Sequence, residues 1–542
     1  MHDIINHTKT LIFRKQKDIL SSVIILSSMM VLSRFLGLVR NRTFATFFSK
    51  EELDLLIAAY RLPDFVFEVL VTGALSSAFI PIFIQYKKNP KELSVKISSI
   101  VNLLTLMLFV FMLLSFIFAD VIIRIITPGF TPSQIKEVTY IARIYLISQM
   151  PFFVFGNILS GIAQANRIFM LTALAPLIYT IGVIGGTVFL SHSFWLYGPV
   201  IGTVAGAFLF FFIQLPILHI AHFHYSPFVF ERKVLREFFT LFLPRTFSVL
   251  TSQIEQTIDL SLATLVGAGS VTVVNFAQRL QLFPVAFVGM AFGQASLPYI
   301  SSLYKDHNID AIRKLFVDSI LQLVYLSVPL GIFFIFARTP IVRIAYGGRM
   351  FDWEATVLTA STLSYFGLSI PFHSIFYFVT RAFYAAHDTK TPLYINLFSI
   401  FVNVLLSVLF IIFLHMPVWS LGISFSFAIT LNVILQLAAY YRKVEGFHLT
   451  KLIHHSIKIY LAGFLAALPS YTALKVFDEL LIDTSRSINV FLLLLCVFII
   501  YGIGYLFFSW LFNIEEVYIL GKLLRKIKIL RRQVEEPVTQ AS

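Results

Sequence analysis

The chain has 542 residues, of which 58% are hydrophobic and 13% are charged, and its formal net charge is +14. Soluble domains carry about twice this charged fraction, so the composition excludes an ordinary water-facing surface. The basic excess lies in short loops rather than on a basic, aromatic platform, and we therefore expect no nucleic-acid partner.

Apolar runs of about 20 residues, the length that crosses a bilayer, recur throughout the chain. The first run is too long for a cleavable signal, and no small-residue cleavage site precedes Arg34, Arg40 and Arg42. We predict an all-α polytopic membrane protein with fourteen transmembrane helices, near 21–48, 54–86, 96–126, 136–165, 170–190, 196–220, 238–265, 271–303, 315–338, 355–386, 392–414, 418–440, 453–475 and 488–513. These spans leave no room for a soluble catalytic domain.

Loop charge predicts the orientation. Lys and Arg are roughly fourfold more frequent on one side of the predicted spans, the side that carries both chain ends. By the positive-inside rule, we expect both termini in the cytoplasm of a bacterial inner-membrane protein.

An internal repeat relates the first six predicted spans to the next six at a nearly constant offset. Arg61-Leu62 is followed by Gly73-Ala74-Leu75-Ser76, and Arg279-Leu280 is followed by Gly293-Gln294-Ala295-Ser296. Six helices are an even number, so two such halves would be parallel repeats, as in some transporters. The predicted parts are a cytoplasmic segment 1–20, an N-lobe 21–220, a linker 221–237, a C-lobe 238–440, two extra helices in 453–513, and a basic cytoplasmic tail 514–542.

Ionisable residues inside the predicted spans concentrate in the first two helices of each half. Each costs about 2.5–3.5 kcal/mol at a helix centre on insertion scales, so such residues are usually functional or paired. Arginine suits phosphate because its planar fork donates two parallel hydrogen bonds. We expect a cationic cavity for an anionic headgroup, lined by Arg34, Arg40, Arg61 and Arg279. The alternative is snorkelling or pairing with nearby carboxylates, which we favour for Arg42.

The chain has no phosphate-binding Gly-Lys loop and no nucleophile elbow. We therefore expect a transporter without catalytic residues, driven by an ion gradient, the membrane potential or the substrate gradient. One cysteine, Cys496, allows no disulfide. His219, His222 and His224 are interpreted as interfacial histidines rather than a metal site, and no cofactor is expected.

Several segments resemble the MurJ (MviN) lipid II flippases. The first is Ser33-Arg34-Phe35-Leu36-Gly37-Leu38-Val39-Arg40, which is similar to that family's first-helix signature. The others are Asp54, Tyr60-Arg61-Leu62-Pro63, the run 72–81, Arg279-Leu280 with Pro284, and 381–385 followed by Asp388-Thr389-Lys390-Thr391-Pro392.

This resemblance implies a two-lobed fold of the multidrug/oligosaccharidyl-lipid/polysaccharide exporter type and alternating access. It implies lipid II, an undecaprenyl-pyrophosphate disaccharide-pentapeptide, as substrate, with its tail along the last two helices and with membrane lipids and the cell-wall synthesis machinery as partners. Arg34, Arg40, Asp54 and Arg279 carry over as functional residues, and Gly37 as a hinge. Asp259 and Asn403 resemble part of a sodium site, so coupling to Na⁺ or to the membrane potential is implied.

The chain also departs from the family pattern. An arginine pair expected in helix 2 is replaced by Phe67-Glu68, and a carboxylate expected in helix 11 is replaced by Ser407. The alternatives that remain are a flippase for another polyprenyl-pyrophosphate-linked glycan, a drug/cation antiporter of the same superfamily, and a membrane-embedded glycosyltransferase. The antiporter would have twelve helices and an acidic cavity, and the glycosyltransferase would need carboxylates on a large outside loop.

Overall fold

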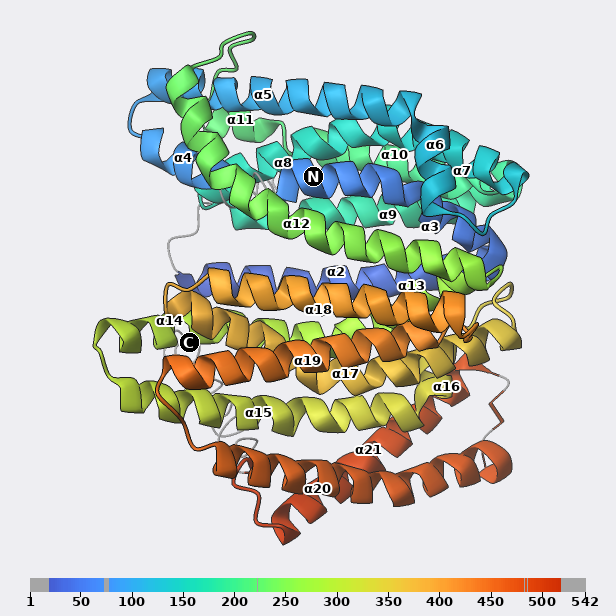
Figure 1. Ribbon diagram of the computed structural model, residues 1–542. Helices are drawn as coiled ribbons and strands as arrows, with labels where there is room; N and C mark the ends of the chain where they lie inside the picture. The colour runs from blue at the N-terminus through green and yellow to red at the C-terminus, as the bar shows by residue number, and fades with distance from the viewer. Residues whose placement is uncertain (1–18, 73–77, 222, 482, 485, 518–542) are drawn as a thin grey trace, which may run out of the picture. The chain divides into compact units, whose positions relative to one another are not determined.

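A computed structural model describes residues 19–72, 78–221, 223–481, 483–484 and 486–517 (Figure 1). Every regular element in these ranges is helical, which confirms the predicted all-α class. The described chain divides into two compact units. One comprises residues up to 275 with 345–356 and 407–418, and the other comprises 276–344, 357–406 and the residues from 419 onward.

The first unit is built from the helices between residue 19 and the start of α13. Several are interrupted or extended by a π-helical turn, written η. The elements are α2 (Ile19–Phe47), α3 (Lys50–Phe67), η1 (Glu68–Thr72), α4 (Ile80–Tyr86), α5 (Pro90–Ile117), α6 (Ala119–Ile126), α7 (Pro132–Ile144), η3 (Tyr145–Gln149), α8 (Met150–Ala165), α9 (Phe169–Phe194), α10 (Tyr197–Phe212), α11 (Pro216–Ile220) and α12 (Arg232–Val266).

The second unit contains most of the remaining helices, and η5 and the ends of α16 and α17 belong to the first. The elements are α13 (Ser270–Val285), η4 (Ala286–Met290), α14 (Ala291–Lys305), α15 (Ile309–Phe336), α16 (Arg338–Tyr346), α17 (Trp353–Ala385), α18 (Lys390–Val408), η5 (Leu409–Phe413), α19 (Ser420–Lys443), α20 (Leu449–Val476), η6 (Phe477–Leu481) and α21 (Ser487–Leu511).

Ten helical stretches in the described ranges are long and apolar enough to span a membrane. They correspond to ten of the fourteen predicted spans, and the count of fourteen stays a prediction. The predicted spans without a match are 21–48, 54–86, 238–265 and 355–386. Three of these, 21–48, 54–86 and 238–265, carry most of the ionisable residues predicted to lie within the membrane, and charged residues lower the mean hydropathy of a helix.

Equivalent contacts occur in both predicted halves. The hydroxyl of Ser160 on α8 donates to the side chain of Gln214 at 2.6 Å. The hydroxyl of Thr380 on α17 donates to the side chain of Gln436 at 3.3 Å. The two hydroxyl residues and the two glutamines are separated along the chain by nearly the same offset, so one buried polar contact is made twice.

Helix boundaries repeat at nearly the same offset. The π-helical turn η1 begins at Glu68, and its counterpart η4 begins at Ala286. Asn89 and Asn308 cap α5 and α15 by accepting from backbone amides three positions further on. These correspondences are the pattern that the predicted parallel repeat requires. Helix α12, however, packs on α5, α6 and η1 within the first unit, and the lobe boundaries stay a prediction.

Small residues bring α9 and α10 into close contact. A methyl group on Gly182 would lie 2.6 Å from the Cα of Gly206, so the two backbones meet without side chains between them. Such close approach is how helices associate in lipid, where the hydrophobic effect no longer drives packing. It supplies a rigid wall for the first unit, against which α2 also packs.

Candidate functional site

Asp54 joins α3 to the start of α13. Helix α3 begins with a capping box, in which Ser49 Oγ accepts from the Glu52 amide and Glu52 accepts from the Ser49 amide. This cap fixes the first turn, and Asp54 follows one turn later. Its Oδ2 accepts from the Gly269 amide at 2.7 Å, and its Oδ1 accepts from the Thr272 amide and hydroxyl at 2.7 Å each. Asp54 is 1% exposed.

This arrangement makes Asp54 a cap supplied by another helix. The first amides of α13 have no partner within their own helix, and a carboxylate satisfies them and complements the helix dipole. Lys50 supports the same junction, since its carbonyl accepts from the Thr272 hydroxyl at 2.9 Å and its ammonium lies 3.1 Å from Glu354. Asp54 is predicted from the sequence to be functional, and in the structure its partner is the start of α13.

Gly269 allows the junction to close. Its φ is +84°, in the left-handed region that favours glycine, and a Cβ there would collide with the side chain of Lys50. Gly269 is not predicted as a site residue from the sequence, because the short run Gly267-Ala268-Gly269 is typical of an ordinary connection between helices.

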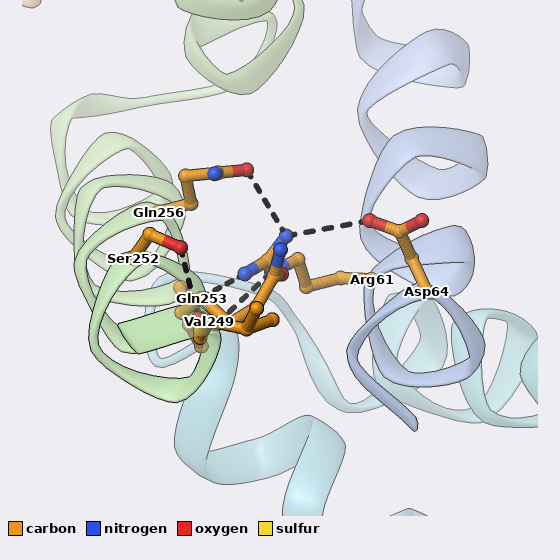
Figure 2. Close-up of polar contacts among 7 residues, drawn as sticks. Arg61, Asp64, Val249, Ser252, Gln253 and Gln256 are labelled. Atoms are coloured by element: carbon orange, nitrogen blue, oxygen red, sulfur yellow. Dashed lines mark hydrogen bonds and ion pairs between the residues drawn. The ribbon is translucent and has the colours of Figure 1, made fainter. Parts of the chain in front are cut away.

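Arg61 is bound by α12 (Figure 2). Its Nε donates to the Thr257 hydroxyl at 2.9 Å, Nη1 donates to the Gln256 side chain at 3.4 Å, and Nη2 donates to the Gln253 carbonyl. Nη1 also lies 3.6 Å from Asp64, the pair expected from their three-residue spacing. The guanidinium is thus engaged with protein, and a cavity role for Arg61 stays a prediction.

Arg34, Gly37 and Arg40 lie on α2, which runs as one helix through all three. Arg34 is exposed, and a methyl group on Gly37 would meet nothing within 4 Å. Arg40 is half-buried, and its Nε and Nη2 donate to the Asn41 side chain at 3.3 and 3.2 Å. The hinge role of Gly37 stays a prediction.

A polar cluster beside Arg40 was missed by sequence reasoning. Gln149, in η3, donates to the hydroxyls of Tyr60 at 2.7 Å and Tyr179 at 3.3 Å, and the two hydroxyls contact each other. Arg40 lies close enough to Tyr179 and Tyr145 to interact electrostatically. π-Helical turns are frequent at functional sites, but nothing in the sequence indicates that Gln149 lies in one.

Arg279 lies on α13 in the second unit. Two residues later, the Gln281 side chain donates to the Ser369 hydroxyl at 2.9 Å and lies 3.1 Å from His373 Nδ1. Asp259 lies on α12 and Asn403 on α18, in different units. The candidate ion site therefore stays a prediction.

An apolar groove of about 450 Å³ crosses the second unit. It lies between η4 and α14 on one side and α15 and α21 on the other. Its lining includes Phe287, Phe292, Tyr325, Pro329, Phe498 and Tyr505. Helix α21, the last predicted span, contributes to this groove, but no residue of α20 lines it.

No metal site is evident in the described ranges, where no three His, Cys, Asp or Glu side chains gather as a metal would require. His222 lies outside the described residues. Among the predicted site residues, the cationic side chains and Asp54 lie on α2, α3 and α13.

Comparison with known proteins gives a consistent result. Residues 44–501 match the family model described as lipid II flippase MurJ. The probable lipid II flippase MurJ of Rickettsia prowazekii is 30% identical over 397 residues, covering 70% of this chain and 76% of that protein. The lipid II flippase MurJ of Thermosipho africanus is 28% identical over 397 residues, covering 72% and 80%.

Solved structures show the same relationship. A lipid II flippase MurJ in an inward closed conformation aligns with a TM-score of 0.75 and 26% identity, over 90% of this chain and 99% of that one. An inward-facing multidrug resistance transporter of the MATE family aligns with a TM-score of 0.68 and 15% identity, over 78% of this chain and 98% of that one. The second likeness shows a shared fold.

Proposed function

The chain belongs to the lipid II flippase MurJ family, and from this premise we propose that it moves lipid II from the inner to the outer leaflet of the cytoplasmic membrane. The observation that carries the proposal is the family match over residues 44–501. The chain is a polytopic membrane protein and a transporter rather than an enzyme. Its role is to supply cell-wall synthesis with the lipid-linked precursor.

The junction at Asp54 is suited to open and close during alternating access. In the predicted orientation, this junction lies on the outer side, where the α2–α3 and α12–α13 connections meet. The hydrogen bonds from Gly269 and Thr272 to Asp54 hold α3 against the first turn of α13. Opening that side requires these bonds to break, so the junction acts as a gate whose strength depends on one carboxylate.

Headgroup binding is assigned to arginines on the first helices of each half. We assign pyrophosphate contact to Arg34, Arg40 and Arg279, because a guanidinium binds phosphate oxygens in pairs. Arg61 contacts α12 in this structure. Arg61 would reach the substrate only in a conformation in which its contacts with α12 are broken. In that conformation it would supply the positive charge that the expected arginine pair, replaced here by Phe67-Glu68, would otherwise provide.

The isoprenoid tail is assigned to the groove on α15 and α21. The groove is lined by aromatic and aliphatic side chains. Moving a long apolar chain from lipid onto such a surface costs little free energy, because both environments are apolar. Its headgroup would then enter the polar interior while its tail stays lateral, which separates the two parts of an amphipathic substrate.

The driving force is the membrane potential or a Na⁺ gradient, with Asp259 and Asn403 as the candidate ion ligands. Both termini lie in the cytoplasm, and enzymes that polymerise peptidoglycan take the flipped product.

The test is complementation of a bacterial strain depleted of its own lipid II flippase, combined with an assay of lipid II accessible from outside. We expect restored growth and restored external lipid II. Lysis with lipid II confined to the inner leaflet, despite normal expression of the chain, would contradict the proposal. A drug-efflux assay in the same cells tests the antiporter alternative, and we expect no change in drug resistance.

A further inference from the structure

The connection between α11 and α12 contains an irregular segment, residues 223–231, that lies along the first turns of α5. None of the transport steps proposed above uses it. Three serine hydroxyls of α5 accept hydrogen bonds from its backbone amides: Ser94 from His224 at 3.2 Å, Ser98 from Ser226 at 2.9 Å and Ser99 from Glu231 at 3.1 Å. The segment is therefore held on α5 along most of its length.

Asn102 of α5 completes this clamp. Its Nδ2 donates to the carbonyls of Ser226 at 3.1 Å and Val229 at 3.0 Å. Its Oδ1 accepts from the Tyr225 hydroxyl at 2.5 Å. Asn102 lies four residues after Ser98, so the two side chains share one face of the helix. The side chains of α5 thus satisfy backbone groups that an irregular segment cannot satisfy by itself.

The position of the clamp along α5 places the segment at the edge of the hydrocarbon core. Helix α5, Pro90–Ile117, is long and apolar enough to span a membrane. A core about 30 Å thick takes about 20 residues of helix, which counted back from Ile117 begins near Ile97. Ser98 and Asn102 therefore lie in the first turns of the span. Irregular backbone at this depth needs protein partners for its polar groups, and α5 supplies them.

Aromatic side chains of the segment point away from the protein. Phe228 is 92% exposed, and the side chains of Tyr225 and Phe230 are about half exposed. Phe228 has φ +56°, in the left-handed region that few residues with a side chain adopt. Figure 1 shows the segment as the green loop that extends beyond α5. Exposed aromatic rings at this level are typical of segments that lie where a bilayer meets water.

Basic side chains gather beside the segment. The Tyr86 hydroxyl, at the end of α4, donates to Glu237 of α12 at 3.5 Å, which brings the α4–α5 connection next to the start of α12. Residues 86–92 and 231–237 carry exposed cations at Lys87, Lys88, Lys91, Arg232, Lys233 and Arg236, and carboxylates only at Glu92, Glu231 and Glu237. Such an excess of positive charge at a membrane surface attracts anionic lipid headgroups.

We propose that the segment 223–231, together with Arg232 and Lys233, forms a binding site for an anionic phospholipid. Phe228 and Phe230 insert among the upper parts of the acyl chains, and the two cations bind the phosphate oxygens. The depth of the segment on α5 favours lipid over a protein partner, because lipid surrounds a membrane span at this level. In the predicted orientation the lipid belongs to the cytoplasmic leaflet. The site requires only that the chain spans a bilayer, and it does not depend on the substrate that is moved.

The experiment places a fluorophore on the segment. Phe228→Cys is labelled with bimane in the full-length chain that also carries Cys496→Ser, and the protein is embedded in phosphatidylcholine nanodiscs. The quenchers are aqueous iodide and either phosphatidylglycerol or phosphatidylcholine with a nitroxide near the headgroup. We expect weak quenching by iodide, and stronger quenching by the phosphatidylglycerol than by the phosphatidylcholine. Arg232→Gln together with Lys233→Gln should weaken association of the phosphatidylglycerol roughly tenfold, because each basic residue adds to the attraction.

Matched variants separate this site from general effects of charge and labelling. Lys136→Gln removes an exposed cation of α7 and should leave the preference for phosphatidylglycerol unchanged. The same label on Asp306→Cys, in the exposed connection between α14 and α15, should be quenched mainly by iodide. Asn102→Ala removes part of the clamp and should increase quenching by iodide at position 228.

Three outcomes would overturn the proposal. Iodide quenching at position 228 as strong as at position 306 would place the segment in water. Equal quenching by the two nitroxide lipids would show apolar insertion without a headgroup site. Protection from iodide that appears only after cytoplasmic proteins are added would assign the segment to a protein partner. The labelled Phe228→Cys chain decides each of these outcomes, so none depends on whether the charge variants fold.

Discussion

Asp54 accepts two hydrogen bonds from Thr272, one from the amide and one from the hydroxyl, each at 2.7 Å. The two residues lie far apart in the chain, and this contact closes α3 onto the first turn of α13. A side chain that caps another helix costs about 0.5–2 kcal/mol when it is removed. The junction is thus strong enough to favour the closed state and weak enough to open in the proposed transport cycle.

Replacing Asp54 tests this gate. Asp54→Ala should destabilise the closed junction by about 2 kcal/mol, because the cap and its charge are both lost. The measurement is labelling of a cysteine introduced at Ala268 by a membrane-impermeant maleimide, in a background with Cys496 replaced. We expect faster labelling. Glu51→Gln is the matched control, since no described hydrogen bond joins Glu51 to α13, and equal rates in both variants would remove the gate.

Gly269 should not tolerate a side chain. Gly269→Ala places a Cβ against Lys50 and forces a residue with a side chain to φ +84°, a conformation that costs of order 1–3 kcal/mol. We expect a lower thermal unfolding midpoint and weaker complementation. Gly185→Ala in α9, where a Cβ meets nothing within 4 Å, should be neutral or slightly stabilising. A midpoint for Gly269→Ala that equals that of Gly185→Ala would show that the connection is not restrained.

Part of this site could be predicted from the sequence, and part could not. Arg34, Arg40, Arg61 and Asp54 are visible because charge within apolar runs is costly and therefore conspicuous. Their partners are not visible. Gly269 and Gln253 reach Asp54 and Arg61 through backbone atoms, and a backbone donor or acceptor leaves no mark on residue type. The sequence therefore identifies the charged site residues but not the groups to which they bind.

The same limit applies to the fold. Hydropathy predicts the apolar helices, since ten of them are long and apolar enough by composition alone. It does not predict the π-helical turns η1 and η4, because an extra residue in one turn depends on packing rather than on local preference. Hydropathy also does not predict which helices α12 packs against. In the structure α12 packs on α5, α6 and η1, and its Thr257 hydroxyl accepts from Arg61.

Arg61 should be needed for its shape as well as its charge. Arg61→Lys keeps the positive charge but loses the fork that reaches both Thr257 and Gln256. We expect a loss of about 1–3 kcal/mol, measured as unfolding in denaturant, because buried acceptors on α12 lose a charged donor. Gln256→Ala, which removes one 3.4 Å contact, should cost less. Full stability in Arg61→Lys together with lost complementation would instead assign Arg61 to the substrate.

The cavity arginines should be needed for transport and not for folding. Arg34→Ala and Arg279→Ala should each abolish complementation while expression and the unfolding midpoint stay close to those of the native chain. The reason is that a bidentate phosphate contact has no substitute in alanine. Arg42→Ala is the control, because we expect Arg42 outside the cavity. Complementation by both Arg34→Ala and Arg279→Ala would rule out the cationic-cavity mechanism.

Asp388, in the connection between α17 and α18, gives a prediction about pH. Burial alone would raise the pKa of this carboxyl, but the Thr391 amide, the Lys443 ammonium and the Thr391 hydroxyl outweigh it and lower the pKa below its usual value. Its folded pKa is below its unfolded pKa, so its contribution to stability is present above about pH 4. That contribution is lost as the pH falls through the lower, folded value.

Asp388→Asn should therefore be less stable than the native chain at pH 7 and at pH 5, by the same amount. The difference should shrink only below about pH 4, where the native carboxyl takes up a proton and loses its 3.1 Å ion pair with Lys443. Thermal unfolding in detergent between pH 3 and pH 7 measures it. A difference that already declines between pH 7 and pH 5 would show that Asp388 does not set the pH dependence.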